Sequence, residues 1–134
     1  MEYLPVLLGA VSAMVVGAVY YHPKVFGTVW MAESGMTEEK IKSANMAKTY
    51  GIAFVLAAIF SLFMMNNVAD PDPQFHTFKH GAFHGVLVAL FTALPIIVTN
   101  ALFEQKSMKH AFINVGYWVA TLAVIGGIAS AMQG

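Results

Sequence analysis

The sequence contains no cysteine and no arginine, and charged side chains make up only 10% of its 134 residues. Without cysteine, the chain can form no disulfide, thioether link to haem, thiolate zinc site or cysteine nucleophile. Seven lysines balance seven acidic residues, and no basic cluster concentrates positive charge for binding to phosphate. We therefore expect no nucleic acid among its partners.

Motifs for catalysis are also missing. No serine, threonine or tyrosine has a histidine and a carboxylate at a known motif spacing, and no glycine-rich phosphate loop or zinc-hydrolase pattern occurs. We therefore expect that the protein is not an enzyme and that it uses no cofactor.

Apolar residues are abundant instead, at 58% of the chain, and they fall in four stretches without a charged side chain, residues 3–21, 49–69, 81–103 and 111–134. Each is close to the roughly 20 residues that cross a hydrocarbon core about 30 Å thick. The sequence predicts an all-α membrane protein with the lipid bilayer as its solvent. Four transmembrane helices, at about 3–21, 45–67, 78–103 and 110–132, should form one compact bundle and a single domain, 1–134.

The lysines predict how these helices are oriented. Only Lys79 lies in the second connection between spans, whereas six lysines lie in or beside the first and third connections. Cytoplasmic connections carry the excess of lysine, so both termini should lie on the opposite side of the membrane. The six residues are Lys24, Lys40, Lys42, Lys48, Lys106 and Lys109.

The first connection begins with an amphipathic segment. Pro23 disfavours a helical conformation in the residue before it, so the first helix should end at His22. Val25, Phe26, Val29 and Trp30 then share one face of a short helix, which we expect to lie in the membrane surface.

Two further positions should shape the longer helices. Thr37 can cap a new helix, because Glu38 and Glu39 follow it at the positive end of the helix dipole. Pro95 should kink the third span and free the carbonyl of Phe91, which the Thr92 hydroxyl or a neighbouring helix could satisfy.

Small residues recur four positions apart in every predicted span. Lipid provides no hydrophobic drive between helices, so association depends on close backbone approach, which small residues permit. We expect these stripes to hold the bundle together and one of them to face another subunit. They comprise Gly9, Ala13 and Gly17, then Ala53, Ala57 and Ser61, then Gly81, Gly85, Ala89 and Ala93, and finally Ala123, Gly127 and Ala131.

Two segments carry a resemblance to a known family. The run YYHPKVFGTVWM at residues 20–31 resembles the aromatic-aromatic-x-Pro-x-x-Phe-Gly-x-x-Trp-Met motif of small bacterial membrane proteins catalogued as domain of unknown function 1761. Asn100, Phe103 and Glu104, with Gly116 and Tyr117, are similar to its Asn-x-x-Phe-Glu and Gly-Tyr elements. The resemblance implies a four-helix fold in the bacterial inner membrane, but no activity or cofactor. In that membrane, the lysine distribution places both termini in the periplasm. The family commonly has a small polar residue at the position of His22, so the resemblance implies no role for this histidine.

Polar side chains in or beside the spans form the first candidate site. Asn100 and Asn114 each lie seven residues from Ser107, at the middle of the last turn, so they should reach the same depth. One interpretation is a purely structural interhelical hydrogen bond, direct or through one water. The other is a polar pocket at the cytoplasmic end, made of Asn100, Asn114, Glu104, His110, Tyr117 and His22.

A histidine stripe forms the second candidate site. Asp72, His76, His80 and His84 follow one another at intervals of four residues, a spacing at which histidines can chelate a transition metal. The stripe turns by about 40° per step, so one ion cannot reach all four. Alternatively, His76 and His80 are wetted interface residues and His84 bonds to a neighbouring helix.

Two functions fit these features. The first is a structural or accessory membrane protein, homo-oligomeric or a subunit of a larger membrane assembly. The second is a small oligomeric transporter or channel whose polar path uses the Asn100–Asn114 pocket and His84, and metal binding by the histidine stripe is a lesser alternative.

Overall fold

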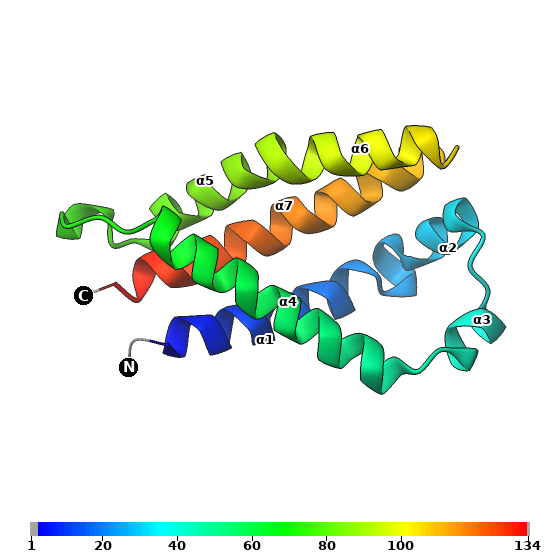
Figure 1. Ribbon diagram of the computed structural model, residues 1–134, viewed down its shortest axis with the longest axis horizontal. Helices are drawn as coiled ribbons and strands as arrows, with labels where there is room; N and C mark the ends of the chain where they lie inside the picture. Colours follow the sequence, from blue (N-terminus) through cyan, green and yellow to red (C-terminus); the bar gives the residue numbers. More distant parts are fainter. Residues whose placement is uncertain (1–2, 134) are drawn as a thin grey trace.

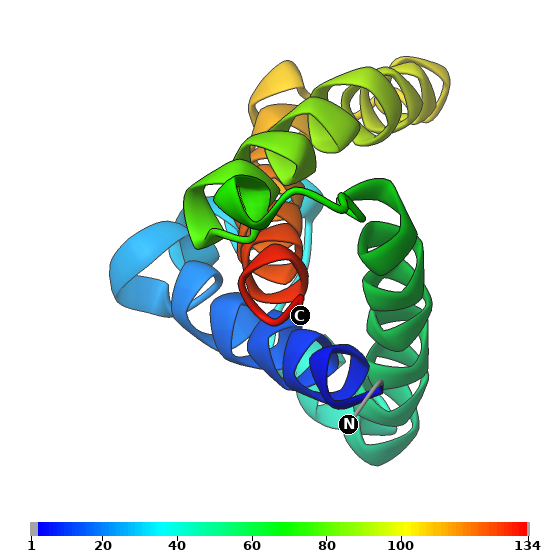
Figure 2. The same cartoon turned by 90° about the vertical axis from the view of Figure 1, so that its left-hand side faces the viewer.

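Over residues 3–133, the part that this computed structural model describes, the secondary structure consists of helices joined by short turns, with no strand. The long helices are α1 (Leu4–Tyr20), α4 (Met46–Asn67), α5 (Phe78–Val88), α6 (Leu94–Phe103) and α7 (Met108–Ala131). Helix α7 lies in the middle and packs against α1, α4, α5 and α6 (Figure 1). The end-on view shows α1, α4 and α5 arranged around α7 (Figure 2).

Three helical segments are long and apolar enough to cross a membrane, namely Met46–Asn67, Phe78–Phe103 and Met108–Ala131. A fourth crossing results if α1 and the segment Pro23–Ser34, which are bent by 48° relative to each other, form one broken span. Large apolar side chains such as Ile59 and Phe63 are exposed on α4. Extended apolar surface of this kind is unfavourable in water, so the surface fits the membrane character that the sequence predicts.

The bend after α1 occurs at the proline that predicted it. Helix α1 ends at Tyr20, and His22 is extended and caps the π-helical turn η1 (Pro23–Gly27). Gly27 is required in this turn, because a Cβ atom there would overlap the Tyr21 carbonyl. The chain continues as α2 (Thr28–Ser34).

The amphipathic segment packs partly on the end of α1. The Phe26 ring lies 4.7 Å from that of Tyr20, and the Trp30 ring lies 5.6 Å from that of Tyr21. Part of its apolar face is therefore used inside the protein.

Side-chain caps mark the starts of the next two helices. Thr37 accepts a hydrogen bond from the backbone N–H of Lys40, which confirms the predicted cap of α3 (Glu38–Ser43). The chain then becomes extended at Ala44, and Asn45 caps α4 by accepting from the N–H of Lys48 at 3.1 Å. Each side-chain cap satisfies a donor that the helix start would leave unpaired.

The third predicted span contains a π-helical turn, η3 (Ala89–Ala93), between α5 and α6. This turn ends two residues before Pro95 and adapts the helix to the missing proline N–H. The predicted role of Thr92 is wrong, because its hydroxyl donates to the carbonyl of Val88 at 2.6 Å rather than to that of Phe91. The 3₁₀ turn η2 (Pro73–Phe75) precedes α5.

Glycines of the small-residue stripes lie where helices touch. In α5, a Cβ atom on Gly81 would overlap the carbonyl of Gly126 on α7, and one on Gly85 would overlap the carbonyl of Leu122. In α1, a Cβ atom on Gly9 would overlap the Ser61 hydroxyl of α4. The two contacts of α5 bring its backbone closer to that of α7 than any side chain would allow, and Gly9 leaves room for the Ser61 side chain.

Further stripe residues also lie at or near helix contacts, whereas Ala131 is exposed. A Cβ atom on Gly17 would lie 3.4 Å from the Tyr117 ring, and one on Gly127 would lie 2.5 Å from the Phe78 ring. Ala13 and Ala89 are buried, and the backbone nitrogen of Ala123 would lie 2.8 Å from a Cβ atom on Gly85.

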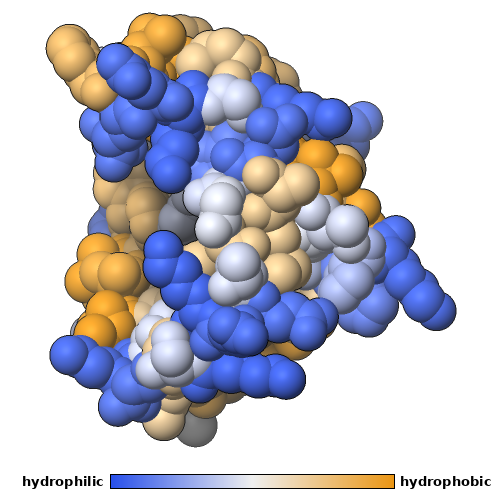
Figure 3. All heavy atoms as spheres, turned by 90° about the vertical axis from the view of Figure 1, so that its right-hand side faces the viewer, coloured by the Kyte–Doolittle hydropathy of each residue, from blue (hydrophilic) through white to orange (hydrophobic). Residues whose placement is uncertain are grey.

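Hydrophilic side chains gather at the end of the molecule that carries α2, α3 and the α6–α7 turn (Figure 3). Six of the seven lysines fall in or next to these segments. The first candidate site lies at this end.

Candidate functional site

A chain of hydrogen bonds joins the end of α1 to the start of α7. The Tyr21 hydroxyl donates to Asn114 Oδ1 at 2.7 Å, and Asn114 Nδ2 donates to His110 Nε2 at 3.3 Å. Because His110 accepts on Nε2, its neutral ring carries the proton on Nδ1. That nitrogen is buried and has no hydrogen-bond partner within residues 3–133.

Aromatic side chains hold Tyr21 in place. Its ring lies 5.1 Å from that of Tyr20 and 5.3 Å from that of Tyr117. The Tyr20 hydroxyl donates to the carbonyl of Ile113, and a Cβ atom on Gly116 would overlap this hydroxyl. The two segments that carried the family resemblance therefore pack directly against each other.

A small polar pocket of about 190 Å³ lies beside this chain, between α6 and α7. Glu104 and Lys106 bring opposite charges to its wall, and the side chains of Asn100, Asn114 and His110 bring polar atoms. The lining consists of Ile97, Asn100, Ala101, Glu104, Lys106, His110 and Asn114. Its volume and charges suit water or a small polar solute.

Helix α2 is fastened to the turn next to this pocket. The Ser107 hydroxyl donates to Glu33 Oε2 at 2.8 Å, and Lys106 Nζ donates to the Ser34 carbonyl at 3.4 Å. Ser107 also caps α7 by accepting from the His110 N–H. Its hydroxyl therefore ties Glu33 of α2 to the start of α7.

The structure brings four of the six predicted pocket residues together: Asn100, Glu104, His110 and Asn114. Within residues 3–133, no hydrogen bond joins Asn100 to Asn114. The side chain of Asn114 is instead bonded to Tyr21 and His110. The predicted direct pairing of the two asparagines is therefore not what the structure contains.

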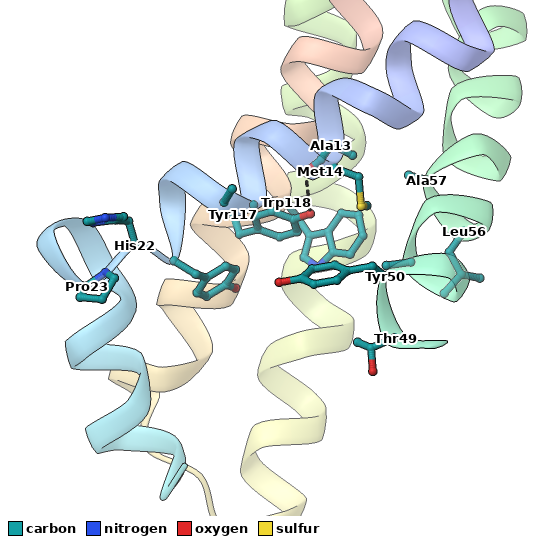
Figure 4. A pocket seen from close by; sticks show the side chains of 14 residues that line it. Ala13, Met14, His22, Pro23, Thr49, Tyr50, Leu56, Ala57, Tyr117 and Trp118 are labelled. Carbon is teal, nitrogen blue, oxygen red and sulfur yellow. Dashed lines mark hydrogen bonds between the residues drawn. The ribbon is translucent and has the colours of Figure 1, made fainter. Parts of the chain in front are cut away.

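His22 and Tyr117, the other two predicted residues, lie elsewhere. His22 is exposed, and its Nδ1 accepts from the N–H of Lys24 at 3.1 Å. The Tyr117 hydroxyl donates to the carbonyl of Ala13 at 3.4 Å. Both line a second, larger cavity of about 670 Å³ between α1, α4 and α7 (Figure 4).

Mostly apolar side chains line this larger cavity. Its aromatic members are Tyr21, Tyr50, Tyr117 and Trp118. Tyr21 belongs both to its wall and to the hydrogen-bonded chain, so this chain connects the two cavities.

The histidine stripe lies at the opposite end, around the start of α5. His76 Nε2 lies 2.6 Å from the Asp70 carbonyl, and His84 Nδ1 lies 2.9 Å from Asn67 Oδ1 on α4. The rings of His80 and His84 are 4.4 Å apart. Over residues 3–133, no group of three or more histidine, aspartate or glutamate side chains is placed to hold a metal ion. The predicted three-histidine site is thus not assembled, and His84 instead links α5 to α4.

Sequence reasoning did not identify Tyr21, Trp118 or Tyr50 as site residues. Tyr21 could have been found, because a tyrosine at the end of one span and an asparagine within another are natural partners in lipid. The cavity residues gave no such signal, since aromatic residues near the ends of spans are common.

These features define an all-helical protein with three or four helices able to span a membrane. Its two cavities are connected by the hydrogen bonds of Tyr21, Asn114 and His110. The chain belongs to the family described as "Protein of unknown function (DUF1761)", which matches residues 4–130. No curated protein and no solved structure matches it.

Proposed function

We propose that the protein is an integral protein of the bacterial inner membrane that crosses it four times as one bundle, with both termini in the periplasm. The first crossing in the sequence consists of α1 with the bent segment Pro23–Ser34. The α2 part of this segment reaches the lysine-rich cytoplasmic surface. The position of six lysines at one end of the molecule supports this orientation.

Topology reporters test this placement. Alkaline phosphatase fused to the C-terminus should be active, because it folds only in the periplasm, whereas the same enzyme fused after Lys106 should be inactive. Green fluorescent protein at the two positions should give the opposite pattern. Phosphatase activity after Lys106 with none at the C-terminus would show that the orientation is reversed.

Within the membrane, the protein acts as a non-enzymatic structural or accessory subunit that forms homo-oligomers. The observation that carries this proposal is the amide of Asn100, which is exposed on α6 and has no hydrogen-bond partner within residues 3–133. Polar side chains at membrane depth are costly unless they are paired. Ile96 and Phe103 flank it on the same helical face and are 59% and 86% exposed, so this face can pack on a second copy with the two Asn100 amides paired.

Cysteine cross-linking tests this interface cleanly, because the chain has no cysteine of its own. Asn100→Cys in native membranes should give a disulfide-linked dimer on mild oxidation. Phe83→Cys, on the exposed side of α5, is the matched control and should remain monomeric. Equal cross-linking of both variants would indicate random collision and contradict the α6 interface.

A transporter or channel is the second candidate. The hydrogen-bonded chain of Tyr21, Asn114 and His110 favours it, because this chain connects a polar pocket at the lysine-rich end to a cavity deeper among the helices. We favour the accessory role over transport, because both cavities lie in the lysine-rich half of the molecule and, over residues 3–133, do not form a path to its other end.

A further inference from the structure

The larger cavity has the dimensions of a ligand site. Its volume of about 670 Å³ falls within the range of roughly 300–1,000 Å³ that small-molecule sites occupy. Along α4 it extends from Thr49, in the first turn, to Ala57, eight residues further, which is about 12 Å at 1.5 Å per residue. It therefore runs from the lysine-rich end of the helices towards their middle.

Two polar groups interrupt its apolar wall. The Trp118 indole is fixed by packing on Phe60 and Tyr117, at ring separations of 4.9 and 5.1 Å. Neither its N–H nor the Tyr50 hydroxyl takes part in a hydrogen bond within residues 3–133, and both side chains line the cavity (Figure 4). An occupant that is mostly apolar but carries a hydrogen-bond acceptor would satisfy them.

Two lysines are sequence neighbours of residues at the outer end of the cavity. The lining residues Pro23 and Thr49 are adjacent in sequence to Lys24 and Lys48, and both lysines are exposed. The opposite end, at Ala13 and Ala57, is apolar and buried. The cavity thus has the polarity of an amphiphile with an anionic head and an apolar tail.

We propose that this cavity holds one acyl chain of an anionic glycerolipid. The ester carbonyl accepts from the Trp118 N–H or the Tyr50 hydroxyl, the chain lies against Ala13, Met14 and Ala57, and the headgroup lies near Lys24 and Lys48. The inference rests on the proposed membrane placement, because lipid is the molecule at highest concentration around a cavity among membrane-spanning helices.

Fluorescence quenching by brominated lipids tests the proposal. Trp30→Phe leaves Trp118 as the only tryptophan, and the variant is reconstituted in vesicles of unlabelled phosphatidylcholine with increasing brominated phosphatidylglycerol or brominated phosphatidylcholine. One lysine near an anionic surface contributes about 1 kcal/mol. Half-maximal quenching should therefore need about five-fold less brominated phosphatidylglycerol than brominated phosphatidylcholine.

Two variants on α4 provide the matched comparison. Ala53→Phe fills the cavity and should remove the preference for phosphatidylglycerol, whereas Val55→Phe, which is 58% exposed and does not line the cavity, should keep it. Equal quenching by the two lipids, or equal behaviour of the two variants, overturns the lipid site. Flotation with the vesicles reports on membrane placement separately. Protein that floats without a lipid preference overturns this site alone, and protein that does not float overturns the membrane placement as well.

Discussion

Replacing Gly85 with isoleucine should separate α5 from α7 and unfold the protein in mild detergent. The Cβ atom alone would overlap the Leu122 carbonyl, and the next atoms of the side chain would enter the α7 backbone. A flexible side chain could move aside, but the peptide groups of a central helix cannot. Overpacking at such a site costs about 3 kcal/mol or more, which corresponds to a fall in melting temperature of about 10 °C or more for a chain of this size.

Gly51→Ile is the matched control for this prediction. Gly51 is also a helical glycine, on α4, but a Cβ atom there would meet nothing within 4 Å. Its replacement should leave the melting temperature unchanged or raise it slightly, because glycine is a poor helix former. If Gly85→Ile and Gly51→Ile melt together at the wild-type temperature, α5 does not approach α7 as the structure describes.

The long helices could be predicted from the sequence because charge and proline mark their ends. The predicted third span, 78–103, covers the residues of α5, η3 and α6, and the predicted second span, 45–67, covers those of α4. Charged side chains are costly in hydrocarbon, so runs that avoid them outline the helices directly. The break at Ala44 and Asn45 needed finer information, since Asn45 could equally have continued the helix.

The contacts of the candidate site were harder to predict, because the depth of a residue along its helix does not determine the direction in which its side chain points. Counting from Ser107 places Asn100 and Asn114 at similar depth, and both do line one pocket. However, each residue turns a helix by about 100°, and the turn at Gln105, where φ is 56°, sets how α6 is rotated relative to α7. The amide of Asn114 consequently points towards α1 and meets Tyr21. Only the packing of all the helices determines that partner.

The hydrogen bond between Tyr21 and Asn114 can be measured by a double-mutant cycle. Asn114→Leu should destabilise the protein by about 2–3 kcal/mol, because it leaves the Tyr21 hydroxyl and His110 Nε2 without their partner. Tyr21→Phe should cost less, since Asn114 keeps its bond to His110. In a protein that already carries Tyr21→Phe, Asn114→Leu should lower the free energy of unfolding by less than it does in the wild type. The reason is that no tyrosine hydroxyl is then left unpaired. We expect a coupling energy of about 1 kcal/mol or more from thermal or denaturant unfolding in detergent.

The parallel cycle with Asn100 decides between the two partners that Asn114 could have. Asn100→Leu and Asn114→Leu should be additive within about 0.5 kcal/mol in the monomer, because no hydrogen bond joins these residues within the described chain. Strong coupling between the asparagines, with none between Asn114 and Tyr21, would restore the direct pair predicted from the sequence and displace α1 from the site. Coupling to Tyr21 alone would establish that α1 and α7 are joined at the level of the two cavities, as both a stable accessory subunit and a polar relay require.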